Sequence, residues 1–349
     1  MKQFNFLAED NRLERLSKMG DPLEKISKVI DFEIFRPILE KTLRNPEKDP
    51  SKGGRPPFDV ILMWKMALLG MWYSLATNII EFMVNDRLTF QRFLGIGLGD
   101  KVPDSNTLWD FKNALALGGV DRQLFDMFTE KMEKMGIITR KGSIVDATFV
   151  DAPRQRNTYE ENEIIKGGNI PEEWEKPENK HKLSQKDTDA RWAKKGDETH
   201  FGYKDHVKVD DSSKMIVDFS VTHAAVHDSQ EFVNLIDEKD NVVSADAAYV
   251  GEDFKKQIHE KCGKKVDLKI NEKGYRNKPL TDEQKAENRE KSKVRSRVEH
   301  VFGFMTVSMG GIIVRTIGLS RAKAEIARRN LAYNLKRYVF LASPKPKTA

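Results

Sequence analysis

The chain has 349 residues, of which 39% are hydrophobic, so it is long enough for two domains with a sizeable core, and its single cysteine excludes an intramolecular disulfide framework. The formal net charge is only +6, yet residues 264–349 carry 21 Lys and Arg against 8 Asp and Glu. A solvated surface would explain any one of these charges, whereas their clustering favours a surface that follows phosphates.

No secretory or membrane segment is expected. The opening residues lack the pattern of a signal peptide. The most apolar run, Val60 to Trp72, is interrupted by Lys65 and falls short of the roughly 20 residues that span a bilayer. We therefore expect a cytoplasmic protein that makes no membrane contact.

Residues 1–135 predict an all-α domain, with a linker near residues 50–57 where Gly and Pro pairs stop regular structure. Asp21 and Pro22 suit the N-cap and the first position of a helix whose apolar residues share one face. A small bundle and a dimerising arm both fit the first 50 residues.

One interpretation of residues 103–113 is a helix-turn-helix. Ser105 or Asn106 would cap a recognition helix that presents Trp109 and Lys112 to DNA. Purely structural helices fit the same pattern.

Residues 136–349 predict a mixed α/β domain with a buried strand that carries an acid. Asp146 lies in the middle of a short, β-branched, apolar stretch, and a buried carboxylate requires a partner. A second apolar strand ends in Asp246, and a later helical pattern carries Glu299. Three acids from two strands and a helix can converge on a divalent metal, because hard cations prefer several oxygen ligands.

A charged span at about residues 153–199 follows the first strand and has too few apolar residues for a core of its own. We expect an insertion that becomes ordered, if at all, on nucleic acid. Trp192 within it would either stack on an unpaired base or anchor a loop. Beyond it, residues 200–209 and 214–221 predict a hairpin, which gives three antiparallel strands with the Asp146 strand. Residues 273–289 are basic and rich in turn formers, and they lead to the Glu299 helix.

Residues 320–338 predict a long helix with apolar residues on one side and basic residues, including Arg328 and Arg329, largely on the other. Both packing and DNA contact fit this basic side, and we expect DNA contact. The chain lacks the G-x-x-x-x-G-K-[ST] phosphate loop, so no nucleotide cofactor is expected.

Five motifs in this order resemble those of bacterial insertion-sequence DDE transposases, in particular the insertion-sequence-five group. They are V-D-A-T at Asp146, F-G-Y-K-x-H at residues 201–206, V-H-D-S at residues 226–229, A-D-A-A-Y at Asp246 and R-x-x-x-E-H-x-F at Glu299. The likeness covers nearly the whole chain, because the helical N-terminal region is similar too. The neighbouring insertion-sequence-four group has Tyr and Lys where this chain has Ser292 and Thr306, so no phosphate contact carries over to these two residues.

The resemblance implies a ribonuclease-H-like core and a catalytic, metal-binding triad of Asp146, Asp246 and Glu299. Two Mg²⁺ ions, or Mn²⁺ in their place, would support hydrolysis at the ends of the element and joining of the freed 3′-hydroxyls to target DNA. The implied partners are the terminal inverted repeats, the target DNA and a second copy of the chain in a homodimer. A bacterial protein associated with the nucleoid is implied as well.

The expected DNA contacts are basic and aromatic side chains near the triad or on the basic surfaces: Arg154, Arg156, Trp192, Lys204, His206, Arg295, Arg297, His300, Arg328 and Arg329, with Trp109 and Lys112 in the N-terminal domain. Arg295 lies four residues before Glu299, so it would either grip a phosphate bidentately or form an intrahelical ion pair. A nuclease of the same fold without strand transfer is one alternative function. A non-catalytic DNA-binding regulator is another, although three carboxylates argue against it.

Overall fold

The structure is a computed structural model, and it describes residues 8–43, 56–249, 252–274 and 279–343. The chain divides into two compact units, residues 1–124 with 331–349 and residues 125–330. The divisions fall within two helices, α8 (Val120–Lys134) and α15 (Leu319–Ala342). The sequence-based boundary at 135/136 assigns all of the last helix to the catalytic part, whereas residues after 330 group with the helical unit. The expected linker near 50–57 lies almost entirely outside the described residues.

The helical unit contains, before α8, eight described helical segments: α1 (Ala8–Lys18), α2 (Pro22–Val29), η1 (Phe32–Phe35), α3 (Arg36–Leu43), α4 (Val60–Trp72), α5 (Thr77–Asp86), α6 (Leu88–Leu94) and α7 (Ser105–Leu117). The predicted start of α2 is confirmed, since the Asp21 side chain accepts a hydrogen bond from the Leu23 N–H at 2.9 Å. Within the described ranges no single helix is long and apolar enough to cross a membrane; α4 and α5 pass that test only as a pair bent by 104°.

The other unit is built on a mixed sheet of six described strands: β1 (Ser143–Asp151), β2 (Arg191–Lys195), β3 (Glu198–Asp210), β4 (Ile216–His223), β5 (Val242–Ala245) and β6 (Asp267–Ile270). The order is β2-β3-β1-β5-β6, and β4 also pairs with β3. β1, β3 and β4 are antiparallel, as predicted, while β5 and β6 continue the sheet parallel to β1. This is the α/β arrangement that the sequence predicts, and its strand order fits the ribonuclease-H-like core that the resemblance implies.

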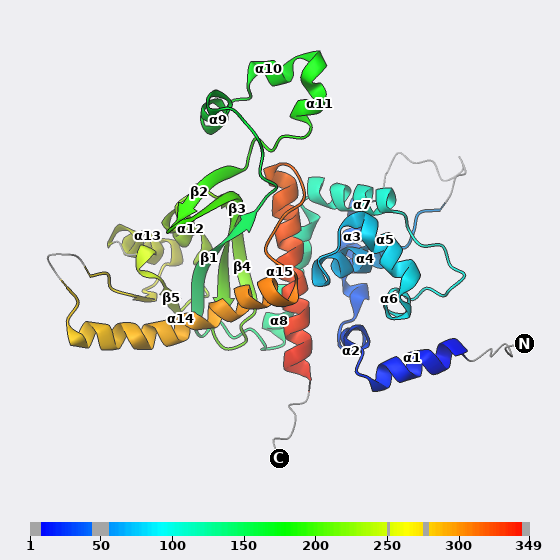
Figure 1. Cartoon of the computed structure of the whole chain (residues 1–349). Coiled ribbons are helices and arrows are strands. Elements are labelled where there is room, and N and C mark those ends of the chain that lie inside the picture. The colour runs from blue at the N-terminus through cyan, green and yellow to red at the C-terminus, as the bar shows by residue number, and fades with distance from the viewer. Residues whose placement is uncertain (1–7, 44–55, 250–251, 275–278, 344–349) are drawn as a thin grey trace, which may run out of the picture. The chain divides into compact units, whose positions relative to one another are not determined.

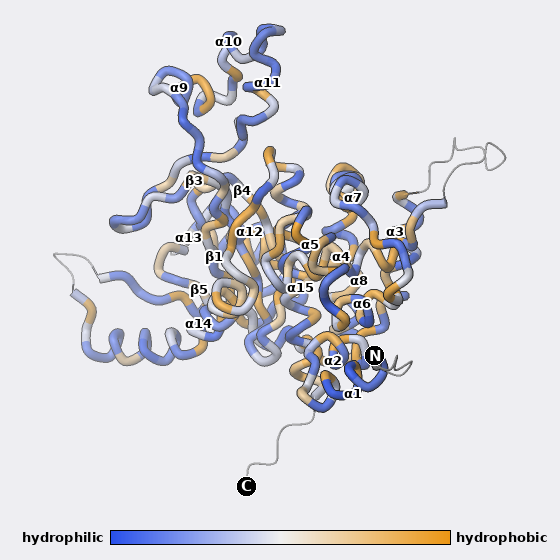
Figure 2. The backbone as a smooth tube through the Cα atoms, turned by 45° about the vertical axis from the view of Figure 1, so that its right-hand side comes forward, coloured by the Kyte–Doolittle hydropathy of each residue, from blue (hydrophilic) through white to orange (hydrophobic). Residues whose placement is uncertain are grey.

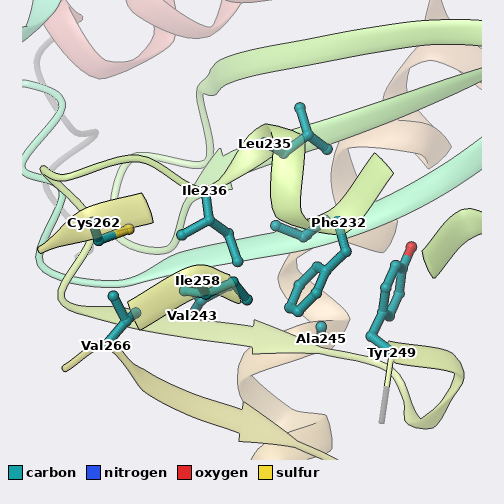
Figure 3. Packing of buried hydrophobic residues seen from close by; sticks show 10 residues of the cluster. Phe232, Leu235, Ile236, Val243, Ala245, Tyr249, Ile258, Cys262 and Val266 are labelled. Carbon is teal, nitrogen blue, oxygen red and sulfur yellow. The ribbon is translucent and has the colours of Figure 1, made fainter. Parts of the chain in front are cut away.

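One face of the sheet is covered by α12 (Asp228–Leu235), the short η4 (Ala247–Tyr249) and α13 (Glu252–Cys262). Figure 3 shows their apolar side chains gathered against β5, with Ile258 of α13 next to Val243 and Phe232 of α12 over Ala245. This cluster holds the end of β5, and therefore the residue that follows it, in a fixed position.

Helix α14 (Asp282–Ser308) packs against β1 and β5 through Val298, Val301 and Met305, which are buried. Its N-terminal half is hydrophilic (Figure 2). The turn-rich connection predicted up to residue 289 is wrong from residue 282 onward, because Thr281 and Gln284 form a capping box that starts the helix there. That Thr-x-x-Gln pattern is a signal that the sequence already contains.

The insertion after β1 has structure of its own, so the prediction that it lacks a core is wrong. It contains α9 (Tyr159–Lys166), α10 (Glu172–Glu175), η3 (Pro177–Asn179) and α11 (Lys180–Leu183), and leads into β2 (Figure 1). Trp174 is fully buried, and its Nε1 donates to Glu161 Oε1 at 2.8 Å. Tyr203 of β3 donates to both carboxylate oxygens of Asp187, at 2.9 and 2.8 Å, which ties the end of the insertion to the sheet.

Candidate active site

Two acids meet where β1 and β5 run side by side. The parallel register pairs Ser143 with Val243 and Ile144 with Ser244, and continuing it by two residues places Asp246 beside Asp146. Each carboxylate accepts a hydrogen bond from the backbone N–H of the next residue, at 2.9 Å for Asp146 and 2.7 Å for Asp246. The sequence prediction that these two acids come together is thus supported by the geometry of the sheet.

The two acids are electrostatically coupled. Burial raises the pKa of Asp146, and the negative charge of Asp246 raises it further, while the Ala147 N–H, Arg295 and Lys195 act in the opposite direction. A carboxylate whose charge is disfavoured by burial and by a second acid is stabilised by a bound cation. The pair therefore has the chemistry of a metal ligand set.

Arg295 reaches this pair from α14. Its Nη1 lies 3.5 Å from Asp146 Oδ2, and its side chain is 24% exposed. Its Nε is buried and finds no hydrogen-bond acceptor among the described residues. The ion pair that Arg295 makes is therefore with Asp146 and not with Glu299 of its own helix. The unused N–H group leaves the guanidinium with capacity for a further oxygen ligand.

Glu299 stands apart from the two aspartates. It follows the buried Val298 on α14, but its own side chain is exposed. Within the described part of the chain no three His, Cys, Asp or Glu side chains are placed so that they could hold a metal ion. The structure thus brings Asp146 and Asp246 together, whereas Glu299, the third predicted ligand, lies on α14 outside this pair.

Tyr249 is a buried neighbour that the sequence analysis did not single out. Burial raises the pKa of its hydroxyl, and the charges of Asp228, Asp146 and Asp246 raise it further. Its ring packs on Phe232 at a centroid distance of 4.8 Å, at one end of the apolar cluster (Figure 3). The A-D-A-A-Y motif contains this residue, so its position three residues after Asp246 was the available signal.

Several of the predicted DNA contacts are accessible. Arg154, Arg156, Trp192 and His300 are exposed. Arg154 donates to the Thr199 carbonyl at 3.1 Å and lies over the Trp192 ring, which also packs on Phe201. These contacts fit the interpretation of Trp192 as an anchor.

Two further candidates are engaged by the protein itself. Lys204 donates to the Val226 carbonyl at 2.7 Å and to Asp228 at 2.8 Å. Arg297 donates to the backbone carbonyl of Asp211 at 3.1 Å. Their charges therefore hold loops against the sheet and against α14.

Three predicted DNA contacts are wrong because the side chains are buried. His206 is 1% exposed, and its Nε2 bonds with the Thr222 hydroxyl at 2.8 Å. Arg328 and Arg329 are 3% and 7% exposed, and Arg329 donates to the carbonyls of Gly311 and Ile313 between α14 and α15. A phosphate contact requires an accessible side chain, so packing is the role of this part of α15.

In the helical unit, α7 begins at Ser105, and its N-cap is Asp104, whose side chain accepts a hydrogen bond from the Thr107 N–H at 2.8 Å. The predicted caps, Ser105 or Asn106, are therefore wrong by one or two residues. Trp109 is 49% exposed on this helix, whereas Lys112 donates to the Thr77 hydroxyl at 2.6 Å. Of the two residues predicted to face DNA, Trp109 is therefore the more accessible.

Comparisons with known proteins identify the family to which the chain belongs. A sequence model described as Transposase DDE domain matches residues 138–335, more than half of the chain, and one described as Transposase domain (DUF772) matches residues 11–114. Among solved structures, a cryo-EM structure of the piggyBac transposase synaptic complex with hairpin DNA is similar at 9% identity, over 93% of this chain and 80% of that chain. Its TM-score of 0.43 is too low to support a functional comparison, so the assignment rests on the two sequence models. The chain belongs to the transposase DDE-domain family and is a transposase.

Proposed function

We propose that this transposase cuts DNA with divalent metal ions held by Asp146, Asp246 and Glu299. The observation that carries the proposal is the pair of aspartates on adjacent parallel strands, one of them with a pKa raised by burial and by the other. Mg²⁺ suits such ligands because it is a hard cation that prefers carboxylate oxygens, and Mn²⁺ would substitute.

Each residue has a distinct part in the proposed site. Asp146 and Asp246 would hold the metal from the sheet, and Glu299 would complete the site when its side chain turns towards them. When bound, the ions would supply the activation of the attacking oxygen and the stabilisation of the leaving oxygen. Arg295 would orient the phosphate, because its guanidinium already lies beside Asp146 and retains an unused N–H.

The proposed reaction has two stages at one site. Water attacks the phosphodiester at the end of the element and frees a 3′-hydroxyl, which then attacks a phosphodiester of the target DNA. Trp109 and the rest of the helical unit would read the end sequence, while Arg154, Arg156 and His300 would contact the backbone. We propose further that two copies act together, one for each end, on the chromosomal DNA of the bacterial cytoplasm.

The proposal is tested with a supercoiled plasmid that carries the inverted repeats flanking the gene. We expect nicking that requires Mg²⁺ or Mn²⁺, and we expect a pre-cleaved end with a 3′-hydroxyl to be joined to a second plasmid. Nicking without joining would favour the nuclease alternative. Binding without either reaction, in any divalent metal, would favour the regulator and reject the proposal.

A further inference from the structure

We propose that Lys194 and Lys195, at the end of the hairpin formed by β2 and β3, hold a DNA phosphate next to the one that is cut. The inference rests on the cleavage function proposed above, because the bound phosphate would belong to the same DNA strand. Neither lysine belongs to a motif that the chain shares with other transposases in the sequence comparison above.

The hairpin is fixed against β1 close to Asp146. Gly202 bends β3 with φ +148°, and a Cβ there would lie 2.3 Å from the Val150 carbonyl oxygen, so only glycine allows this approach. Beyond the bend, the ring of His200 stacks on Phe149 at a centroid distance of 4.1 Å and an interplanar angle of 4°. The end of the hairpin is thereby held over β1 at Phe149, which follows Asp146 by three residues along the strand.

A pocket of about 180 Å³ lies between the hairpin and β1. It is lined by Ala147, Thr148, Phe149, Lys194, Lys195, Lys204 and Asp228. It adjoins the aspartate pair, because Ala147 follows Asp146 directly and because the charge of Lys195 lowers the pKa of Asp146. A strand whose phosphate lies at Asp146 would therefore pass this pocket.

The charge of the pocket comes from the two hairpin lysines. The positive charge of Lys204 is already compensated by an ion pair, since its Nζ lies 2.8 Å from Asp228 Oδ1. Lys194 and Lys195 are exposed, and neither forms an ion pair with any residue that the structure describes. Asp228 is the one acid among the lining residues, and it is already paired with Lys204. Glu198 of the hairpin instead lies 3.7 Å from the imidazole of His200.

These features favour a phosphate over a base as the occupant. The Phe149 ring is engaged by His200 and carries the Lys204 ammonium 5.1 Å from its centroid, so it is not a free stacking platform. Lysine is a mobile point charge that suits a single phosphate. A phosphate bound there would place its negative charge between the two lysine ammonium groups and the metal ions expected at Asp146.

The test uses the full chain with Lys194→Gln and Lys195→Gln together, and Lys256→Gln as the matched control. Lys256 is an exposed lysine of α13 in the same unit. Binding to a duplex of the inverted repeat is measured at several salt concentrations. We expect the double variant to lose about 0.9 from the slope of log K against log salt, the value for one phosphate contact, and the control to lose nothing.

A neutral methylphosphonate placed at one position at a time identifies the phosphate. The substitution next to the cleavage site should weaken wild-type binding and leave the double variant unaffected. Equal methylphosphonate effects in wild type and double variant at every position would overturn the inference. Failure of the wild-type protein to nick the plasmid would instead reject the proposed function, since these binding measurements do not depend on cleavage.

Discussion

The insertion between β1 and β2 should fold without DNA, and Trp174 is the residue on which this depends. Its side chain is fully buried, and its Nε1 donates a hydrogen bond to Glu161. The ammonium groups of Lys182 and Lys186 lie 5.4 and 5.2 Å from the centroid of its ring. Truncating a buried Trp to Ala costs about 3–5 kcal/mol. A core as small as this one rarely supplies more than about 3–5 kcal/mol in total.

Trp174→Ala should therefore unfold the insertion locally while the sheet stays folded. Hydrogen exchange measures this directly: the amides of α9 should exchange at least about a hundredfold faster, since each 1.4 kcal/mol is tenfold, and those of β1 and β5 should not change. Tyr159→Ala is the control, because that side chain is 75% exposed at the start of the same helix. The reasoning is refuted if α9 of the wild type is unprotected without DNA, or if both variants exchange alike.

Three further predictions concern α15, β3 and α14. Arg329→Met should destabilise the fold in urea by about 1–3 kcal/mol for each of the two carbonyls left without a donor, and a changed salt dependence of DNA binding with unchanged stability would contradict this. Burial raises the pKa of Asp205 to about 7. The folded chain therefore keeps a proton on Asp205 that the unfolded chain loses near the ordinary aspartate pKa of about 4. The stability of the fold consequently falls as the pH rises from about 4 to about 7. Asp205→Asn should therefore raise the melting temperature more at about pH 8 than at about pH 5, and equal shifts would argue against the burial of this charge. Arg295→Lys should lower the cleavage rate at least about tenfold with DNA affinity retained, because lysine cannot form the bidentate contact; unchanged kinetics would reject the phosphate role.

The parts of the fold that the sequence predicted well are those with strong local patterns. β1 and β5 are short β-branched runs, and Asp21 with Pro22 is a strong start signal for α2. The hairpin of β2 and β3 was missed although Gly196 and Asp197 form a two-residue connection of a kind typical of hairpins. Its strand residues are mostly charged, which masked the pattern.

The errors at the site have a different physical cause. The basic side of the last helix suggested a surface, but Arg329 satisfies backbone carbonyls of the preceding loop, and no periodicity reveals such a partner. His206 alternates correctly within β3, yet the face it points to is covered. The meeting of Asp146 and Asp246 follows from the parallel pairing of β1 with β5, which sets a residue inside one strand beside the residue that follows the other. The direction of Glu299 depends instead on the rotation of α14 and on an exposed side chain.

The central claim is that Asp146, Asp246 and Glu299 act together as metal ligands, and Glu299 tests it most directly because it lies outside the aspartate pair. Plasmid nicking and DNA affinity should be measured side by side for the three single alanine variants. We predict that all three lose cleavage and keep nearly wild-type affinity, since cleavage depends on the ions and binding chiefly on Lys and Arg contacts. A Glu299→Ala protein that still nicks its substrate at the wild-type rate would contradict the account.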